Sequence, residues 1–359
     1  MPEKKNRKRS SGSKIPSIYD VARQAKVSVF TVSGVINNKT WVSSTLTRRV
    51  NAAVAKLNYR PNLLARSLAK HQTHTIGVMV TNIANPFFPA VVRAAEDAAQ
   101  KAGYSVVLCN SDDKQQKEAR YLDLLISKRV DGIILNKAPG ELSASQKKML
   151  SDVQIPVALL MRSCRGLKAD IVQTDDEKGS HDAVAHLIRN GHRRIALVGG
   201  PAYVSDAIAR RRGYHGALEE AGLALDPGLE FYGDYHIESG HRAGLTLLPL
   251  RPDAVLVTNQ LMTVGFMEAA NEMGMRCPED FGLVSFDDYP WLGLYTPRLT
   301  TIELPKYELG ETAVNFLLDR IQGEKGRPRT VTLQPQLRVR DSCGFLSNAR
   351  KTFARRASR

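Results

Sequence analysis

Residues 17–37 read SIYDVARQAKVSVFTVSGVIN, and this stretch decides how the first part of the chain folds. Ser17, followed three residues later by Asp20, forms a capping-box pattern that predicts a helix over 18–25. Ser28 can cap a second helix after only two intervening residues. Two short helices joined by so tight a turn must cross at a steep angle, which predicts a helix-turn-helix.

A third helix is predicted over 43–57, and it closes a small apolar core with the first two. On this geometry alone, an ordinary three-helix module without a DNA-binding role is an open alternative. The residues expected in the core are Ile18, Val21, Ala22, Val27, Val32, Val35, Ile36, Leu46, Val50, Val54 and Leu57.

The positive charge of the chain is concentrated at its two ends. The chain has 359 residues and a net charge of +15. Residues 1–70 hold fifteen Lys and Arg against two acidic residues, a net of +13, and residues 338–359 add +6, so the middle sums to −4. A basic module on a mildly acidic body indicates that the module meets the phosphates of nucleic acid. An anionic membrane is disfavoured, because the module is expected to lack the exposed amphipathic aromatic face that such binding needs.

Composition argues against several other classes of protein. No apolar run reaches the length of a membrane span, and the N-terminus lacks the apolar core of a signal peptide. The four cysteines lie far apart with no C-x-x-C or Cys/His cluster, which indicates neither a metal site nor a disulfide framework. No dinucleotide-binding, P-loop or nucleophile-elbow motif is present. We therefore expect a cytoplasmic protein that is not an enzyme and has no cofactor and no metal.

From residue 75 onward, apolar strands alternate with helical stretches. Two such series predict an α/β body with two doubly wound parallel sheets, each covered by helices. Ligands of such sheets bind at the carboxyl ends of the strands, so the expected site is the cleft between two lobes. The predicted strands are TIGVMV, YSVVLCN, DGIILNK and PVALLMR in the first series, and IVQTDD, RRIALVGG, LEFYGDY, AVLVTN and FGLVSFDD in the second.

The motifs DVARQAKVSVFTVSGVIN and YRPNLLARSLAK resemble the DNA-binding headpiece and hinge of the LacI–GalR family of bacterial transcription regulators. The resemblance extends to Gly344 and implies a two-lobed body like that of periplasmic binding proteins. It also implies three chain crossings between the lobes, near 163–166, 296–299 and 326–329. The implied division is a basic tail (1–15), the headpiece (16–61), a hinge (62–73), a body (74–346) with a first lobe (74–164 and 298–327) and a second lobe (165–297 and 328–346), and a basic tail (347–359).

The resemblance implies that the second headpiece helix enters the major groove, with Val29, Phe30 and Gly34 at base edges. Familiar members carry polar or long side chains here, whereas Val29 and Phe30 offer apolar contact suited to thymine methyl groups. Leu68 matches the hinge leucine that wedges into a central base step of the operator. Arg48 and Arg49 are suited to phosphate contacts. The DNA-binding residues expected are Ser28, Val29, Phe30, Thr31, Ser33, Gly34, Asn37, Asn62, Ala65, Arg66 and Leu68.

In the body, the resemblance implies an effector site with aromatic walls and a charged donor and acceptor. A small polyol or a nucleobase fits such groups, and a structural role is the alternative for each residue. The function implied is a DNA-binding transcription regulator, a homodimeric repressor controlled by a small molecule such as a sugar. A solute-binding receptor using the same body is the alternative. The effector-binding residues expected are Phe87, Phe88, Asp206, Arg210, Tyr235, Asn259 and Asp287.

Overall fold

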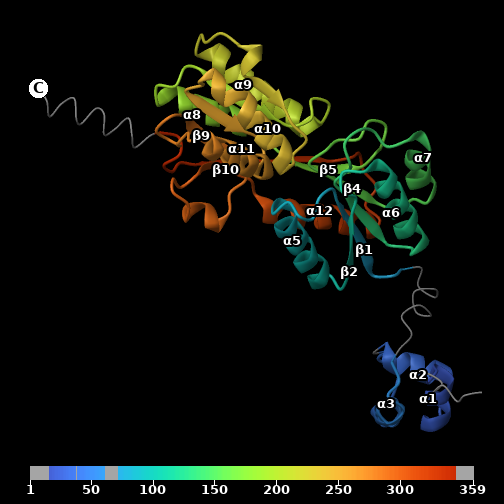
Figure 1. The fold of residues 1–359 in the computed structure, drawn as a ribbon. Coiled ribbons are helices and arrows are strands. Elements are labelled where there is room, and N and C mark those ends of the chain that lie inside the picture. Colours follow the sequence, from blue (N-terminus) through green and yellow to red (C-terminus); the bar gives the residue numbers. More distant parts are fainter. Residues whose placement is uncertain (1–15, 38, 61–71, 345–359) are drawn as a thin grey trace, which may run out of the picture. The chain divides into compact units, whose positions relative to one another are not determined.

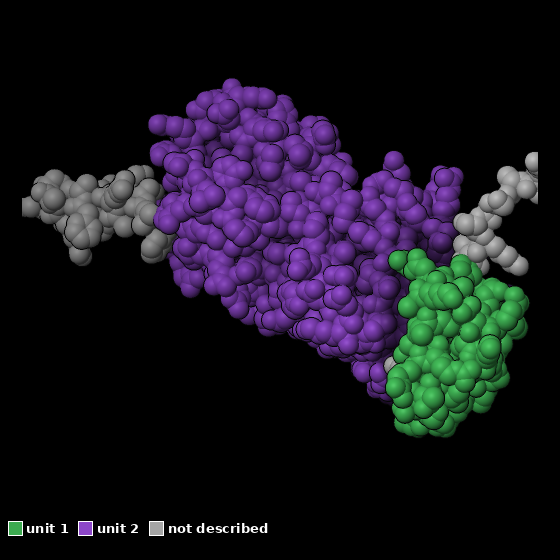
Figure 2. All heavy atoms as spheres, turned by 90° about the horizontal axis from the view of Figure 1, so that it is seen from below, with its two compact units in different colours: residues 1–73 green, residues 74–359 purple. Residues whose placement is uncertain are grey.

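The structure is a computed structural model that describes residues 16–37, 39–60 and 72–344. It consists of two compact units, residues 1–73 and residues 74–359, which are green and purple in Figure 2. Among the residues described, no helix is long and apolar enough to cross a membrane.

Each helix of the headpiece begins after a capping serine. The side chains of Ser17, Ser28 and Ser43 each accept a hydrogen bond from a backbone N–H three positions later. The capping box predicted at Ser17 is confirmed, since the carboxylate of Asp20 accepts a hydrogen bond from the Ser17 N–H at 2.9 Å. The helices are α1 (Ile18–Ala25), α2 (Val29–Ile36) and α3 (Ser44–Leu57).

The predicted headpiece core is confirmed with one exception, Leu46. Val21, Val32 and Val50 are fully buried, and the remaining predicted residues pack with or against them. Leu46 stays partly exposed outside this cluster, because it lies in the first turn of α3, one turn before Val50. Space in the core is filled instead by residues that were not predicted, among them Ala53 and Tyr59.

The first lobe of the body is a six-stranded, all-parallel sheet with the strand order β11-β5-β4-β3-β1-β2. Helix α12 packs against α5 and against three of the strands, and the lobe can be followed in Figure 1. The strands are β1 (Thr75–Val80), β2 (Ser105–Asn110), β3 (Gly132–Leu135), β4 (Val157–Leu160), β5 (Asp170–Thr174) and β11 (Thr330–Leu333). The helices are α5 (Phe87–Lys101), α6 (Gln115–Ser127), α7 (Ala144–Asp152) and α12 (Lys306–Ile321).

The second lobe repeats this architecture with the strand order β12-β10-β9-β8-β6-β7, in which only β12 is antiparallel to its neighbour. Its helices pack in two pairs, α8 with α9 and α10 with α11. The strands are β6 (Ile195–Gly199), β7 (Glu230–Tyr232), β8 (Ala254–Val257), β9 (Gly282–Phe286), β10 (Thr300–Glu303) and β12 (Gln336–Arg338). The helices are α8 (Asp176–Arg189), α9 (Ser205–Glu220), α10 (Ile237–Leu247) and α11 (Gln260–Glu272).

The chain crosses between the lobes later than predicted at all three points. Strand β5 pairs with β4 in the first sheet, and β10 pairs with β9 in the second. The crossings therefore follow β5, β10 and β11, and the predicted crossings near 163–166, 296–299 and 326–329 are wrong, as are the lobe boundaries drawn from them. The physical reason is that each of these strands first completes the edge of the sheet it leaves, a pairing that apolar periodicity does not reveal.

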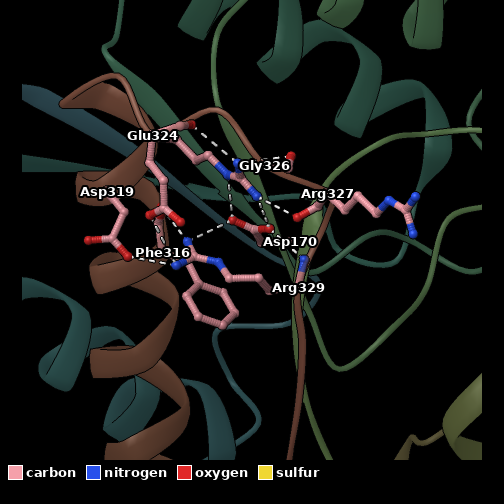
Figure 3. A network of polar contacts seen from close by, with 8 residues as sticks. Asp170, Phe316, Asp319, Glu324, Gly326, Arg327 and Arg329 are labelled. Carbon is pink, nitrogen blue, oxygen red and sulfur yellow. Dashed lines mark hydrogen bonds and ion pairs between the residues drawn. The ribbon is translucent and has the colours of Figure 1, made fainter.

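A buried ion network holds β5 in the first sheet (Figure 3). The Asp170 carboxylate accepts hydrogen bonds from Nε and Nη2 of Arg320, at 2.9 and 2.8 Å, and from the backbone N–H and Nη2 of Arg329, at 2.8 and 3.0 Å. Burial disfavours the charge of Asp170, but these hydrogen bonds prevail and lower its pKa to about 2. The network ties together the start of β5, the end of α12 and the start of β11.

Candidate functional site

A small pocket lies between the two lobes, at the carboxyl ends of strands from both sheets. Its volume of about 50 Å³ leaves room for only a few water-sized groups. Thr81 follows β1, Asn136 follows β3, and Asp287 follows β9. The residues lining it are Thr81, Asn82, Asn85, Phe87, Phe88, Asp113, Asn136, Met161, Arg162, Asp206, Arg210, Tyr235, Asn259, Asp287 and Leu304.

All seven residues expected to bind an effector line this one pocket. Phe87 and Phe88 begin α5 and meet edge to face, with ring centroids 5.2 Å apart. Asp206 and Arg210 lie one turn apart on α9, on the face that points into the body. The structure thus brings together residues that are separated by two hundred positions in the chain.

Arg210 is held rigidly at the floor of the pocket. Its Nε donates to Oδ1 of Asp176 at 3.0 Å, and its Nη1 donates to the backbone oxygen of Thr258. The guanidinium also lies over the ring of Phe286, 4.2 Å from the centroid. These contacts orient the planar group, so its remaining N–H groups are directed before any ligand arrives.

Asp176 was not predicted, although it follows the strand IVQTD directly and is 5% exposed. Burial raises its pKa to about 6, and the neighbouring Arg210 opposes this rise. For Arg210, burial lowers the pKa, but Asp176 raises it above its usual value. The pair is therefore charged on both sides at neutral pH, and each member depends on the other for compensation.

Asp287 and Tyr235 both adopt left-handed backbone conformations, with φ of 71° and 69°. Burial raises the pKa of Asp287, while Lys306 and Arg210 oppose the rise. Tyr235 occupies the space above Gly200, where an added Cβ would lie 2.1 Å from the tyrosine ring. Such strained positions are typical of functional sites in which a side chain must point in one direction.

Asn259 and Asp206 have structural partners in addition to their place in the pocket. The side-chain oxygen of Asn259 accepts hydrogen bonds from the N–H groups of Leu261 and Met262, so Asn259 caps α11. Asp206 lies 3.6 Å from Nε of Arg162. Asn259 therefore has a structural role as the cap of α11, which was the alternative to effector binding. It also lines the pocket.

Sequence reasoning missed several lining residues, of which Arg162 is the most informative. It is 5% exposed, its Nη1 donates to the backbone oxygen of Lys137 at 3.0 Å, and it lies 3.8 Å from Asp113. Burial lowers the pKa of Arg162, but Asp206 and Asp113 raise it above its usual value. The signal was present, because Arg162 ends the predicted strand PVALLMR, where cleft residues are expected.

Four buried polar atoms on lining residues have no hydrogen-bond partner within the described part of the chain. They are Nε of Arg162, Oδ1 of Asn136, Oη of Tyr235 and Oδ1 of Asp287. Buried polar groups are rarely left unpaired in folded proteins. Hydrogen-bond donors and hydrogen-bond acceptors are therefore both available to a polar ligand.

The headpiece presents a second candidate site, on the outer face of α2. Phe30 is 72% exposed, and its ring stacks on that of Trp41, with centroids 4.8 Å apart and planes 15° apart. The expectation that the headpiece lacks an exposed aromatic face is therefore wrong. Trp41 was missed because it lies outside the helix, in the loop that follows it.

Gly34 and Val29 are less available for DNA than predicted. Gly34 is buried, and an added Cβ would lie 2.6 Å from the indole of Trp41. Val29 is partly buried and packs against the headpiece core. The Trp41 ring covers Gly34, so the expected base contact by this glycine stays a prediction and requires the indole to move.

The other expected DNA-binding residues have mixed surroundings. Ser28 caps α2, and Asn37 donates to the backbone oxygen of Ser33 at 2.8 Å. The side chain of Arg49 donates to the backbone oxygen of Ala25 at 2.7 Å, which directs it toward the turn after α1 rather than freely into solvent. The hinge residues Asn62, Ala65, Arg66 and Leu68 lie outside the described residues.

No group of three or more His, Cys, Asp or Glu side chains is placed to hold a metal ion in the ranges that the structure covers. The four cysteines are free and buried. The polar groups of the pocket are thus hydrogen-bonding and charged groups of the kind that bind organic ligands.

Two family models match this chain, one over the headpiece and one over part of the body. The model of bacterial regulatory proteins of the lacI family matches residues 17–62, and that of the periplasmic binding protein-like domain matches residues 184–343. The ribose operon repressor of Escherichia coli is 39% identical over 328 residues, which cover 91% of this chain and 99% of that protein. The transcriptional repressor PurR of Photobacterium profundum is 33% identical over 329 residues, or 91% of this chain and 98% of that protein.

Among solved structures, the chain is similar to the lac repressor dimer bound to operator and the anti-inducer ONPF. The TM-score is 0.81 at 31% sequence identity, with 92% of this chain and 99% of that chain covered. The likeness therefore extends over the headpiece and both lobes of the body.

Proposed function

The chain belongs to the LacI family of bacterial regulatory proteins and is a DNA-binding transcription repressor controlled by a small molecule, and we propose that this effector is a neutral monosaccharide bound in the interlobe pocket. The proposal assigns effector contacts to Phe87, Phe88, Asp206, Arg210, Tyr235, Asn259 and Asp287, and adds Arg162 and Asn136. The observation that carries it is the set of four buried polar atoms without a hydrogen-bond partner among the described residues, one of which, Nε of Arg162, lies at ion-pair distance from Asp206, 3.6 Å away. The hydroxyl groups of a sugar both donate and accept, so one small ring can satisfy all four.

The charge of the pocket favours a neutral sugar over a sugar phosphate or a sugar acid. Its lining holds three carboxylates, those of Asp113, Asp206 and Asp287, against the guanidinium groups of Arg162 and Arg210. Each arginine already has an acidic partner, at 3.6 Å for Arg162 with Asp206 and at 3.0 Å for Arg210 with Asp176. An anionic ligand would meet a net negative surface without a free cation.

The enclosure of the pocket favours the smallest class of sugar. Its volume of about 50 Å³ has to grow for any sugar ring, and a monosaccharide requires a smaller opening of the body than a disaccharide does. The most similar of the relatives described above is a repressor of a ribose operon, which makes pentoses the first class to test. A purine is the second candidate class, because the PurR relative is 33% identical over nearly the same span.

On DNA, we propose that the repressor acts as a homodimer on a pseudo-palindromic operator in the cytoplasm. One headpiece covers too few base pairs for specificity, and twofold symmetry of the protein maps onto two half-sites. The expected contacts of Thr31, Ser33 and Asn37 with phosphate, of Ser28 with DNA and of Phe30 with bases belong to this proposal, together with those of the hinge. Leu68 remains the proposed wedge at the operator centre.

The test is a thermal-shift screen of the full chain against neutral pentoses and hexoses, disaccharides, sugar phosphates and nucleobases. A ligand that binds only the folded state raises the melting temperature, by an amount that grows with its concentration relative to Kd. We expect a shift with one or a few neutral monosaccharides, and a change in operator affinity with the same compound. A rise in melting temperature with nucleobases alone would reject the proposal that the effector is a sugar.

Asp287→Asn gives the matched variant for this screen. Asparagine tolerates the left-handed backbone that residue 287 adopts, so the fold is kept while the carboxylate acceptor is removed. The variant should keep the melting temperature of the unliganded parent and lose most of the ligand-induced shift. An unchanged shift would remove Asp287 from the effector site.

A further inference from the structure

The outer face of α2 is an aromatic surface made by two residues that are not neighbours in the sequence. Phe30 and Gly34 lie one helical turn apart, on the same face of α2. Trp41, which follows the helix, stacks on Phe30 and covers Gly34. Both rings remain accessible, with 72% of Phe30 and 53% of Trp41 exposed.

The glycine at position 34 is what allows the indole to lie there. An added Cβ would approach Cζ2 of Trp41 to 2.6 Å, Cη2 of Trp41 to 2.7 Å and Cγ2 of Val42 to 2.9 Å. Any side chain at this position would therefore push the indole off the helix. Gly34 was expected at a base edge. In the structure it lies beneath the ring of Trp41, which comes from the loop after α2.

The chemistry of this surface restricts what it can recognise in DNA. The faces of both rings are apolar, so they cannot read the donors and acceptors of the base edges. The major groove offers one apolar feature, the C5 methyl group of thymine. The headpiece together with its flanking segments is basic, with fifteen Lys and Arg against two acidic residues over 1–70, and this charge draws the surface toward the phosphates on either side of a groove.

We propose that Phe30 and Trp41 together form the base-reading surface of the headpiece and that they contact thymine methyl groups in each half-site of the operator. Gly34 seats the indole and contacts no base. The inference rests on the proposed function, since it names which feature of the operator the repressor reads.

The experiment first obtains an operator by selecting the full-length chain against a library of random duplexes. Each thymine of the selected half-site is then replaced in turn by uracil, which keeps every hydrogen-bonding group and removes only the methyl group. We expect affinity to fall roughly fourfold for each methyl group that the aromatic surface contacts. Thymines outside the half-sites serve as the control positions and should tolerate the change.

Two protein variants decide whether the lost methyl contact belongs to Trp41. Trp41→Ala should bind the thymine operator more weakly than the parent does and should no longer distinguish thymine from uracil at the sensitive position. Trp41→Phe keeps a ring and should retain part of the distinction. Tyr203→Ala removes an equally exposed aromatic side chain from the body, with Tyr203 69% exposed, and should behave as the parent does.

Fluorescence supplies a readout that does not depend on affinity. Trp41 and Trp291 are the only tryptophans of the chain, so Trp291→Phe leaves Trp41 as the single indole. Binding of the operator should protect Trp41 from quenching by acrylamide. Unchanged quenching in the complex would overturn the inference.

The outcomes separate this inference from the function on which it rests. If selection yields no preferred sequence, the repressor assignment itself fails. If a preferred operator is found but no uracil replacement weakens binding, or Trp41→Ala shows the same uracil penalty as the parent, only the aromatic reading surface fails. If Trp41→Ala loses binding to vesicles of anionic phospholipid and keeps full operator affinity, the surface belongs to a membrane contact and the inference is overturned.

Discussion

The headpiece exposes its candidate functional groups, whereas the body buries them. On α2, Phe30 is 72% exposed, while Arg210 and Asp287 in the interlobe pocket are 5% and 3% exposed. A duplex is recognised by laying a surface into a groove, so its contacts must stand out from the fold. A small molecule is recognised by enclosure, so its contacts must be buried and held in place by other residues.

The two sites also differ in what supports them. The aromatic surface of the headpiece depends on one side chain resting on another, with Trp41 on Phe30 and above Gly34. The pocket depends on buried charges that compensate each other, as in the pair of Arg210 and Asp176 at 3.0 Å. Removing one member of such a buried pair should therefore cost stability as well as function, and a change at the aromatic surface should alter function almost alone.

The largest expected effect is that of Arg210→Ala. Removing one partner of a buried pair leaves Asp176 uncompensated and should lower the free energy of unfolding by roughly 3–5 kcal/mol. The variant should also lose its response to effector. Urea unfolding and an operator-binding titration measure the two effects.

Arg212→Ala is the matched control on the same helix. Arg212 pairs with Glu177 at 2.9 Å, but both side chains are more than half exposed, and such pairs contribute at most about 1 kcal/mol. Adding Asp176→Asn to Arg210→Ala removes the unpaired charge and should restore part of the lost stability. Equal effects of the two arginine variants would contradict the compensated pair.

The next effect is that of Gly213→Ala, in the contact between α9 and α8. An added Cβ would lie 2.0 Å from the backbone oxygen of Glu177, and a backbone atom inside a helix cannot move aside cheaply. We expect a loss of about 3 kcal/mol, the upper end for overpacking. Gly216→Ala lies three residues further along α9, where the nearest atom is 3.8 Å away, and should be neutral or slightly stabilising.

Asp170→Asn should have a moderate effect that depends on pH. The pKa of Asp170 is about 2 in the folded protein, below its ordinary value of 3.8, so ionisation stabilises the fold by about 2 kcal/mol at neutral pH. This contribution is fully present above the ordinary pKa and is lost as the pH falls through the folded value. Parent and variant should therefore differ at pH 7 and converge at low pH.

Asp319→Asn is the control for that pH series, because Asp319 pairs with Arg329 at 2.7 Å but is 45% exposed. Its removal should change the unfolding free energy little at any pH. A constant difference between Asp170→Asn and the parent from pH 7 to pH 2 would show that packing rather than charge accounts for the role of Asp170.

The smallest effect on stability is expected for Gly34→Ala. The new methyl group displaces the exposed Trp41 ring instead of a backbone atom, and alanine favours the helix by about 0.5–1 kcal/mol, so the two contributions nearly cancel. Operator selectivity should nevertheless change, because the indole moves. A thermal melt and a thymine-to-uracil comparison on the same variant separate the two quantities.

Local structure was predictable from the sequence because its causes are local. Ser17 and Asp20 determine where α1 begins, and Ser28 caps α2 three residues after α1 ends. The nine predicted strands of the body all occur, since buried parallel strands need nearly continuous apolar runs. The seven effector residues were found through resemblance to a family, and they line one pocket.

Tertiary structure alone decided the partners of these elements. Strand β5 belongs to the first sheet through its pairing with β4 and β11, and Asp170 at its start binds Arg320, which is 150 residues away. In the same way, only the folded chain pairs the pocket residue Arg162 with Asp206, and the pocket residue Arg210 with Asp176. Capping and helical periodicity act between residues a few positions apart and are therefore visible in sequence spacing, whereas sheet edges and buried ion pairs join residues that only the folded chain brings together.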